Sequence, residues 1–187
     1  MRELELAKSE LKKANNKLSE MAFRDGLTAL YNHRYFKEQL EKEVNRAMRY
    51  QRALSLIIFD LDHFKKINDV HGHLVGDRVL KKVAEIVLLT VRESDMVARY
   101  GGEEFAIILP ETEMKGVVTL AERIRKQIDS LRMELYGKNV GVTASFGVML
   151  WEKGMPHTNK ENLISAADNA LYQSKKKGRN KTSFKGL

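Results

Sequence analysis

The 187-residue sequence contains no cysteine. This absence excludes a disulfide framework and any zinc or iron–sulfur site ligated by cysteine, and it fits a reducing compartment, so we expect a cytoplasmic protein. Long hydrophobic runs are also missing. None approaches the roughly 20 residues of a membrane-spanning helix, so we expect no membrane segment within this chain. The stretch MRELELAKSELKK is charged throughout, unlike a secretory signal.

Apolar residues are nevertheless numerous enough for a core, since 43% of the chain is hydrophobic. Wholesale disorder is therefore not expected, and the length fits one domain or one domain with an appended element. The formal net charge is +8. Such an excess suggests an acidic partner, namely nucleic acid, an anionic membrane or a phosphorylated small molecule, although a solubilising surface charge explains it equally well.

Residues 1–24 carry apolar side chains at alternating spacings of three and four. This heptad-like pattern predicts a helical stalk, and we favour a parallel dimer of such stalks; a solvated helix packed on its own domain is the alternative. About three heptads are marginal for an isolated coiled coil. The apolar positions are Leu4, Ala7, Leu11, Ala14, Leu18 and Met21.

The remaining residues, 25–187, have the apolar spacing of one α+β domain. Strands are predicted for ALSLIIFDLD, for both arms of VARYGGEEFAIIL and for VGVTASFGVML, the last with one buried face. Amphipathic helices are predicted over residues 36–48, 80–91, 117–131 and 163–171. After the first helices the order is β-α-β-β-α-β-α. It contains the ferredoxin-like pattern, an antiparallel sheet with helices on one face.

Four acids lie where strands end or begin. Asp60 and Asp62 end the first core strand, and Glu103 and Glu104 follow the glycine pair of the hairpin. A ferredoxin-like sheet commonly sets the first strand beside the hairpin, which brings Asp60 close to Glu103. Two such carboxylates repel each other unless one is protonated or a cation lies between them. Mg²⁺ suits this arrangement because it keeps positions for phosphate oxygens and water. Solvated strand ends are the alternative.

The turn segment DLDHFKKINDVHGHLVGD is dense in polar groups that suit a nucleotide. Lys65 and the backbone amides of His63 and Phe64 are candidates for holding phosphates, because N–H groups at a helix start bind anions. An Asp and an Asn together, here Asp77 and Asn68, can pair with guanine, whose N1–H and N2–H₂ the carboxylate accepts. A single Asn or Asp in a turn is, however, usually a cap.

Two cations near the carboxyl end lie four residues apart in SKKKGRNK. If the last helix continues, Lys175 and Arg179 share one face and suit terminal phosphates. A basic tail is the alternative interpretation.

Five segments resemble, in the same order, the sequence blocks of the GGDEF family of diguanylate cyclases, whose signature accepts Asp or Glu at its third position. They are DGLTALYN, FDLDHFKKINDVHGHLVGD, RYGGEEF, VTASFGV and ALYQSKKKGRN. The resemblance runs from about Asp25 to Asn180, which is nearly everything except the stalk.

This resemblance implies a palm-like, ferredoxin-like catalytic domain that condenses two GTP into cyclic di-GMP and two pyrophosphates. Each chain would hold half an active site, so the enzyme would be a homodimer, with two Mg²⁺ per half-site and Mn²⁺ as a substitute. Asp60, the Leu61 carbonyl and Glu103 would be metal ligands, and Glu103, Glu104 or water would accept the 3′-hydroxyl proton. The residues implied to hold GTP are His63, Phe64, Lys65, Asn68, His73, Asp77, Gly101, Gly102, Lys175 and Arg179.

The motif RESD resembles the family's product-inhibition site. Arg92 and Asp95 have the RxxD spacing, and an arginine fork can bind guanine O6 and N7 or a phosphate. A surface ion pair is the alternative. Arg46 and Arg123 are further candidate contacts with cyclic di-GMP.

Two rival functions remain open. A non-catalytic cyclic di-GMP sensor would be expected to lose the hairpin acids, the guanine pair or the phosphate lysine, and all are present. The charge and the KKKGRNK segment suggest a nucleic-acid-binding domain as the second rival. Such a domain would need aromatic residues between the basic ones, and this segment has none, so we expect no nucleic-acid partner. A sensor domain upstream of the stalk would lie outside this chain.

Overall fold

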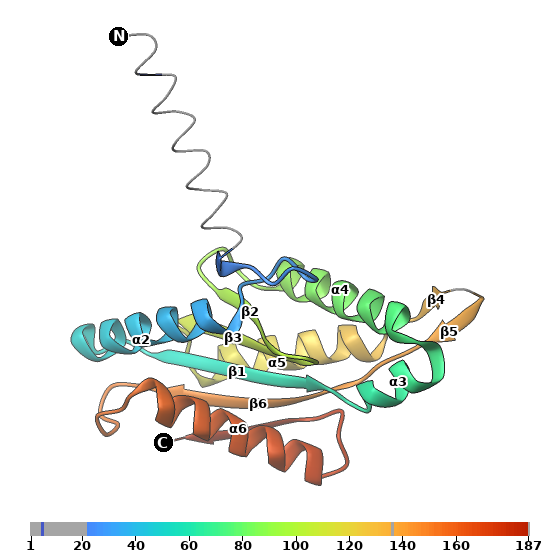
Figure 1. Ribbon diagram of the computed structural model, residues 1–187. Helices are drawn as coiled ribbons and strands as arrows, with labels where there is room; N and C mark the ends of the chain where they lie inside the picture. Colours follow the sequence, from blue (N-terminus) through green and yellow to red (C-terminus); the bar gives the residue numbers. More distant parts are fainter. Residues whose placement is uncertain (1–4, 6–21, 136, 187) are drawn as a thin grey trace.

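The computed structural model of the protein describes residues 5, 22–135 and 137–186 (Figure 1). Most of the predicted stalk lies outside these residues. Its heptad pairing and the proposed domain boundary at residue 25 therefore stay predictions. None of the helices in the described part of the chain has the length and apolar character needed to cross a membrane.

Five strands form the main sheet, in the order β2-β3-β1-β6-β7. They are β1 (Leu54–Leu61), β2 (Met96–Gly101), β3 (Glu104–Pro110), β6 (Ala144–Trp151) and β7 (Thr182–Gly186). The first four pair antiparallel in the ferredoxin-like order, which confirms that part of the prediction. The sheet as a whole is mixed, because β7 pairs parallel to β6. Residues Thr182–Gly186, which follow the basic segment SKKKGRNK, return along the edge of β6, where their backbone finds partners.

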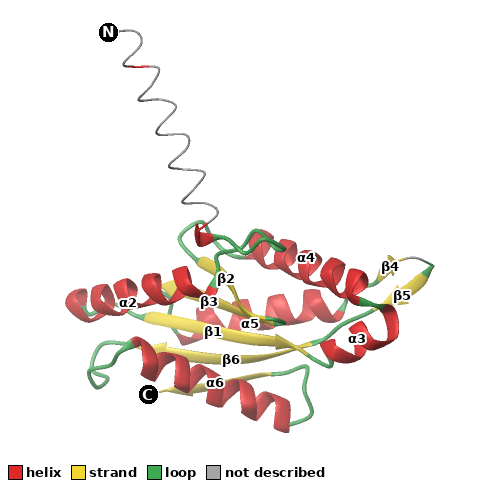
Figure 2. Ribbon diagram, in the orientation of Figure 1, coloured by secondary structure: helices red, strands yellow, loops and turns green. Residues whose placement is uncertain are grey.

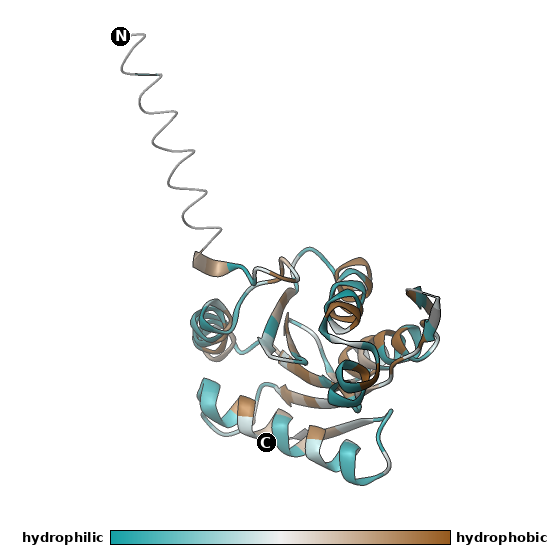
Figure 3. Cartoon of the chain, turned by 45° about the vertical axis from the view of Figure 1, so that its right-hand side comes forward, coloured by the Kyte–Doolittle hydropathy of each residue, from teal (hydrophilic) through white to brown (hydrophobic). Residues whose placement is uncertain are grey.

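Helices cover both faces of this sheet (Figure 2). Apolar residues of α4 (His73–Thr90) and α5 (Met114–Asp129) pack on one face, and those of α2 (His33–Tyr50) and α6 (Lys160–Lys176) pack on the other. The helices carry hydrophilic and hydrophobic residues in alternating bands, as amphipathic helices do (Figure 3). The two helices of the ferredoxin-like core, α4 and α5, therefore lie on one face as expected, and α2 and α6, which lie outside that core pattern, cover the other.

The strand β6 is buried on both faces, contrary to the prediction. Val140 to Leu150 alternate in apolar character, which predicted one buried face, but every residue of β6 is buried. Met149 and Trp151 point to the α2 and α6 side and complete a second core there. The predicted strand is also divided, since Lys138–Val140 forms β5 in a separate hairpin with β4 (Met133–Leu135).

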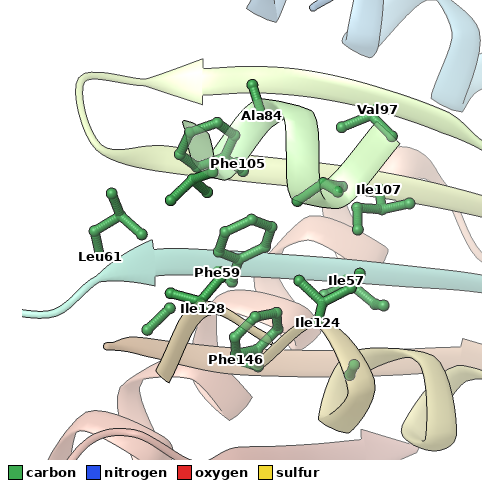
Figure 4. Close-up of a cluster of buried hydrophobic side chains, with 14 of the residues drawn as sticks. Ile57, Phe59, Leu61, Ala84, Val97, Phe105, Ile107, Ile124, Ile128 and Phe146 are labelled. Atoms are coloured by element: carbon green, nitrogen blue, oxygen red, sulfur yellow. The ribbon is translucent and has the colours of Figure 1, made fainter. Parts of the chain in front are cut away.

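Three phenylalanines hold the carboxyl end of β1 in register with its neighbours (Figure 4). Phe59 stacks on Phe105 of β3, with ring centroids 5.0 Å apart, and on Phe146 of β6, at 4.6 Å. The same residues are direct cross-strand partners. Aromatic cross-strand pairs of this kind stabilise register. The stack lies one residue before Asp60, so it fixes where the strand delivers that carboxylate.

Two asparagines start the helices that cover the second face. Asn32 Oδ1 accepts a hydrogen bond from the Tyr35 amide at the start of α2, and Asn159 Oδ1 accepts one from the Asn162 amide at the start of α6. These are N-caps that satisfy free helix donors. At Gly147 a Cβ atom would lie 2.1 Å from the Ala167 carbonyl oxygen, so α6 packs directly on the β6 backbone. This close approach sets the position of Lys175, near the end of α6, against the sheet.

Candidate active site

The β2–β3 hairpin places both of its acids beside the end of β1. Asp60 is the cross-strand partner of Glu104, and the Leu61 amide donates to the Glu103 carbonyl oxygen at 3.2 Å. The proximity of Asp60 and Glu103 expected from topology is therefore present. This proximity has a simple cause. The buried strand β1 pairs with β3 of the hairpin, and the hairpin turn lies level with the end of β1.

The three carboxylates crowd one another electrostatically. Burial raises the pKa of Asp60, an effect that its ion pair with Lys175, 3.0 Å from Nζ to Oδ2, only partly offsets. Burial and the charge of Asp60 also raise the pKa values of Glu103 and Glu104. Ionised acids that raise each other's pKa gain from a cation placed among them. Lys175 supplies one positive charge at this point.

The donor set fits a hard divalent cation that is completed by substrate. Among the residues that the structure describes, no three acidic or histidine side chains converge as a finished metal cage. Mg²⁺ rarely needs one, because it is usually held by one or two carboxylates together with phosphate oxygens and waters. Asp60, Glu103 and the carbonyl of Leu61 supply oxygen ligands of the appropriate kind.

Asp62 has a different role from its neighbour. Its carboxylate accepts hydrogen bonds from Thr143 Oγ1 at 2.7 Å, Ser145 Oγ at 2.7 Å and the Asn180 amide at 3.0 Å. These three donors compensate the buried carboxylate for the hydrogen bonds that it would make to water. Asp62 therefore ties the carboxyl-terminal turn to the sheet rather than facing a ligand.

Lys175 and Arg179 do not share a helical face. The α6 helix ends at Lys176, and Gly178, Arg179 and Asn180 follow with positive φ angles of 102°, 61° and 46°. A shared face required the helix to continue past Lys176, and it does not, because the chain turns back here to deliver the Asn180 amide to Asp62. The turn still leaves Arg179 near enough to Asp60 for its charge to lower the pKa of that carboxyl, against the larger effect of burial.

The amides predicted to bind phosphates lie at the start of α3 (Phe64–His71), which replaces the expected turn. His63 precedes this helix with φ 57°, and no side chain in the described part of the chain caps the helix. The first N–H groups of a helix have no acceptor within it. Here they are left to water or a ligand, and Lys65 lies exposed beside them.

The residues expected to bind guanine lie on two adjoining helices. Asn68 is on α3 and Asp77 is on α4, and Gly72 joins the helices in a left-handed conformation (Figure 1). The Oδ1 atom of Asn68 is buried and has no hydrogen-bond donor within the described parts of the chain. Such an atom is unfavourable unless a ligand or water supplies the donor. His73, the first residue of α4, is exposed at the same corner.

The glycines of the hairpin are not required by the backbone. Neither Gly101 nor Gly102 has a positive φ angle. A Cβ atom on Gly102 would meet no atom within 4 Å, and one on Gly101 would meet only Glu104 Oε2, at 3.0 Å. The space in front of the turn is therefore open to a ligand.

Sequence reasoning missed Arg99 and Asp168. Arg99 donates through Nε and Nη2 to the Gly102 carbonyl oxygen, and through Nη1 to the Asp25 carboxylate at 3.2 Å. Asp168, on α6, has a pKa raised by burial, and its charge contributes to the raised pKa of Glu104. Both lie inside or next to the motif blocks RYGGEEF and ALYQSKKKGRN, which was the only available signal.

The RxxD residues line a separate cavity of about 550 Å³. Asp95 Oδ2 accepts a hydrogen bond from the Arg92 backbone amide at 2.9 Å, so the pair is not a simple surface ion pair. Arg123 lines the same cavity and donates to the Thr90 carbonyl oxygen. Arg46 does not reach it; it lies within ion-pair distance of Glu43 and Glu111 on the neighbouring surface.

Solved structures of GGDEF domains resemble this architecture. The coiled coil and GGDEF domain of DgcB from Caulobacter crescentus, in complex with c-di-GMP, matches with a TM-score of 0.88 and 31% identity over 98% of both chains. Diguanylate cyclase SiaD from Pseudomonas aeruginosa, in complex with its activator SiaC, matches with a TM-score of 0.84 and 34% identity over 98% of this chain and 70% of that one.

Sequence comparison agrees with the structural likeness. Diguanylate cyclase A of Treponema denticola is 37% identical over 91% of this chain and 46% of its own length, and DosC of Escherichia coli is 39% identical over 86% and 34%. The profile of the family described as "Diguanylate cyclase, GGDEF domain" matches residues 22–181. The chain belongs to this family. It spans less than half the length of these two relatives.

Proposed function

We propose that this protein is a diguanylate cyclase, which condenses two GTP molecules into cyclic di-GMP and releases two pyrophosphates. One observation carries the proposal most strongly. The carboxylates of Asp60, Glu103 and Glu104 meet at one end of the sheet. The uncapped start of α3 follows directly after that end of β1, where phosphates would be held. Family membership and relatives named as diguanylate cyclases support the same activity.

The metal ligands would be Asp60, the Leu61 carbonyl and Glu103, with two Mg²⁺ per half-site or Mn²⁺ in their place. When bound, the cations lower the pKa of the attacking 3′-hydroxyl and neutralise charge on the leaving pyrophosphate. We assign acceptance of the proton to the Glu103–Glu104 pair, because these carboxylates lie at the hairpin beside the place where the cations would be held, and a general base must lie within reach of the proton that it takes.

GTP would be held at both of its ends. The amides of His63 and Phe64, with Lys65, Lys175 and Arg179, would bind the triphosphate. In the protein without substrate, Lys175 pairs with Asp60. Its ammonium is therefore already in the site when the phosphates arrive.

The purine would enter between α3 and α4. Asp77 would accept guanine N1–H and one hydrogen of N2, and Asn68 Oδ1, which lacks a donor among the described residues, would accept the other N2 hydrogen. His73 would lie near the base. Gly101 and Gly102 would allow the nucleotide to approach the hairpin.

Two chains must face each other, because each would bind one GTP and aim its 3′-hydroxyl at the α-phosphate of the other. We propose a homodimer in which residues 1–24 pair as a stalk and set this encounter. The DgcB structure with its coiled coil and GGDEF domain is similar over nearly the whole of this chain, which supports a stalk of that kind. An upstream sensor domain and a cytoplasmic location complete the proposal.

Incubation of the purified protein with GTP and Mg²⁺, followed by chromatographic identification of the nucleotides, tests the activity. We expect cyclic di-GMP and pyrophosphate, with ATP left unchanged. Any cyclic di-GMP carried through purification is removed first. Binding of cyclic di-GMP without turnover of GTP would contradict the enzyme and favour the non-catalytic sensor.

A product-inhibition site at Arg92 and Asp95, extended by Arg123, is the second part of the proposal. The cavity that these residues line supports it. Arg46 lies outside that cavity and would contact cyclic di-GMP only if the ligand extends past Glu111. Arg92→Ala should leave the initial rate unchanged and weaken inhibition by added cyclic di-GMP. Inhibition as strong as that of the wild type would place the inhibitory site elsewhere.

A further inference from the structure

We propose that Gly76 positions the guanine-reading amide of Asn68, because its missing side chain leaves the notch between α3 and α4 in which that amide lies. The inference rests on the proposed function, which gives Asn68 its role toward guanine. Gly76 itself would not touch the base. It would act through Asn68 and so determine nucleotide specificity.

The space at Gly76 is already filled by Asn68. A Cβ atom built on Gly76 would lie 1.9 Å from Asn68 Oδ1 and 3.0 Å from its Cγ. On the other side, Phe64 Cζ would be 3.1 Å away, and Phe64 is buried. The amide oxygen thus occupies the volume of the absent side chain. Even alanine would force the Asn68 side chain out of its place.

The backbone gives no competing reason for a glycine here. Gly76 is the fourth residue of α4 and does not have a positive φ angle. A glycine inside a helix is less favourable than alanine at the same position. Helix propensity therefore does not explain a glycine here, and the severest contact that a side chain would make is with Asn68, ahead of the tight one with Phe64.

The side chain of Asn68 in this notch has one unsatisfied hydrogen-bond acceptor. Its buried Oδ1 has no donor among the described residues, and the exocyclic amino group of guanine is a donor of the required kind. Hypoxanthine is the same purine without that amino group. A site built to hydrogen-bond a group discriminates strongly against the analogue that lacks it. Asn68 would therefore add to the preference for guanine over hypoxanthine that Asp77 also supports, and Gly76 would preserve the contribution of Asn68.

The experiment compares the equilibrium affinities of GDP and IDP, with Mg²⁺, for the wild type, Gly76→Ala, Asn68→Ala and the double variant. We expect the wild type to prefer GDP by about tenfold or more, and all three variants to show one common, smaller preference, because Asp77 still accepts a hydrogen of N2. Gly26→Ala is the matched control, because a Cβ atom there meets nothing within 4 Å. It should keep the wild-type ratio.

Thermal unfolding of the same proteins separates positioning from a general packing defect. If Asn68 is what the new methyl group strikes, Gly76→Ala should lower the unfolding temperature in the wild-type background. In the Asn68→Ala background it should leave that temperature unchanged or raise it, since alanine favours the helix. A double variant as unstable as its Gly76→Ala parent would show that the clash lies elsewhere, and would overturn the inference.

The two proposals fail in different ways. A wild type that binds IDP as tightly as GDP would contradict guanine reading in the proposed function itself. A wild type that prefers GDP, with Gly76→Ala retaining the full preference, would overturn only the role of Gly76. If Gly76→Ala does not fold, the double variant still decides through its stability, because it should fold if the clash is with Asn68 and fail to fold if the clash lies elsewhere.

Discussion

Asp60 and Asp62 lie two residues apart at the end of β1, and the groups that surround their carboxylates differ. The Asp62 carboxylate accepts hydrogen bonds from three donors, which lie in two distant segments. Asp60 has one cationic partner, Lys175, and has two further acids beside it. One carboxylate completes the fold, whereas the other is left in need of positive charge.

The contrast shows how a site can be recognised in a structure without a ligand. Polar groups that serve the fold have partners supplied by the fold. Groups that bind a ligand are left without full compensation in its absence. The carboxylates near Asp60 have too little positive charge around them, and Asn68 Oδ1 has no hydrogen-bond donor among the described residues. The predictions below test whether Asp60 and Asp62 divide between them the roles of ligand binding and stability.

The largest effect should come from Asp60→Asn, which keeps the size of the side chain and removes its charge. We expect cyclic di-GMP formation to fall by about 10³-fold or more, because a metal ligand and its charge are lost. The unfolding temperature in EDTA should change little, because the substitution removes both the cost of burying the charge of Asp60 and the opposing gain from its ion pair with Lys175. Steady-state rates and thermal unfolding measure the two effects. A variant with near-wild-type turnover would remove Asp60 from the site.

Asp62→Ala should show the reverse pattern. Removal of the carboxylate leaves the hydroxyls of Thr143 and Ser145 and the Asn180 amide without their acceptor. We expect the free energy of unfolding to fall by about 3 kcal/mol, measured by urea denaturation. Asp69→Ala, at an exposed position of α3, is the control and should change stability by less than about 0.5 kcal/mol. Equal effects of the two variants would contradict the structural role of Asp62.

The smallest effect should be a pH dependence of the metal-free protein. Because the folded-state pKa of Glu104 is raised, its contribution to stability is present below the ordinary carboxyl pKa and is lost as pH rises through the raised value. Glu104→Gln should therefore be slightly more stable than the wild type at pH 7, by less than about 1 kcal/mol after solvent screening, and no more stable at pH 4.

Thermal unfolding in EDTA across this pH range measures the difference. Glu152→Gln, which changes an exposed carboxylate, is the control and should follow the wild type at every pH. A stabilisation by Glu104→Gln that is the same at pH 4 and pH 7 would show that the charge of Glu104 is not its cause.

Much of the fold could be predicted because its signals are local. The apolar run of β1 and the alternation along the hairpin arms define strands by themselves, and topology then brings Asp60 to Glu103. The strand β7 could not be predicted, since a short segment such as TSFKG carries no strong period and depends on the free edge of β6. The covered second face was missed because Met149 and Trp151 were not weighed as core residues.

The parts of the site that escaped prediction depend on contacts between distant segments. Arg99 reaches Asp25, 74 residues away, and neither residue is unusual by itself. The partners of Asp62 lie more than 80 residues along the chain. The position of Arg179 depends on a turn that ends α6 just before it. Local spacing contains none of this information.

Binding of Mn²⁺, followed by the electron paramagnetic resonance signal of the free ion, tests the central claim most directly. The protein is titrated in the presence of the α,β-methylene analogue of GTP, whose carbon bridge replaces the bond that the reaction breaks. We predict that the wild type removes Mn²⁺ from solution, that Glu103→Gln weakens this binding by at least about tenfold, and that Asp69→Asn does not. A Glu103→Gln protein that binds Mn²⁺ as tightly as the wild type would contradict the assignment of the hairpin acid as a metal ligand.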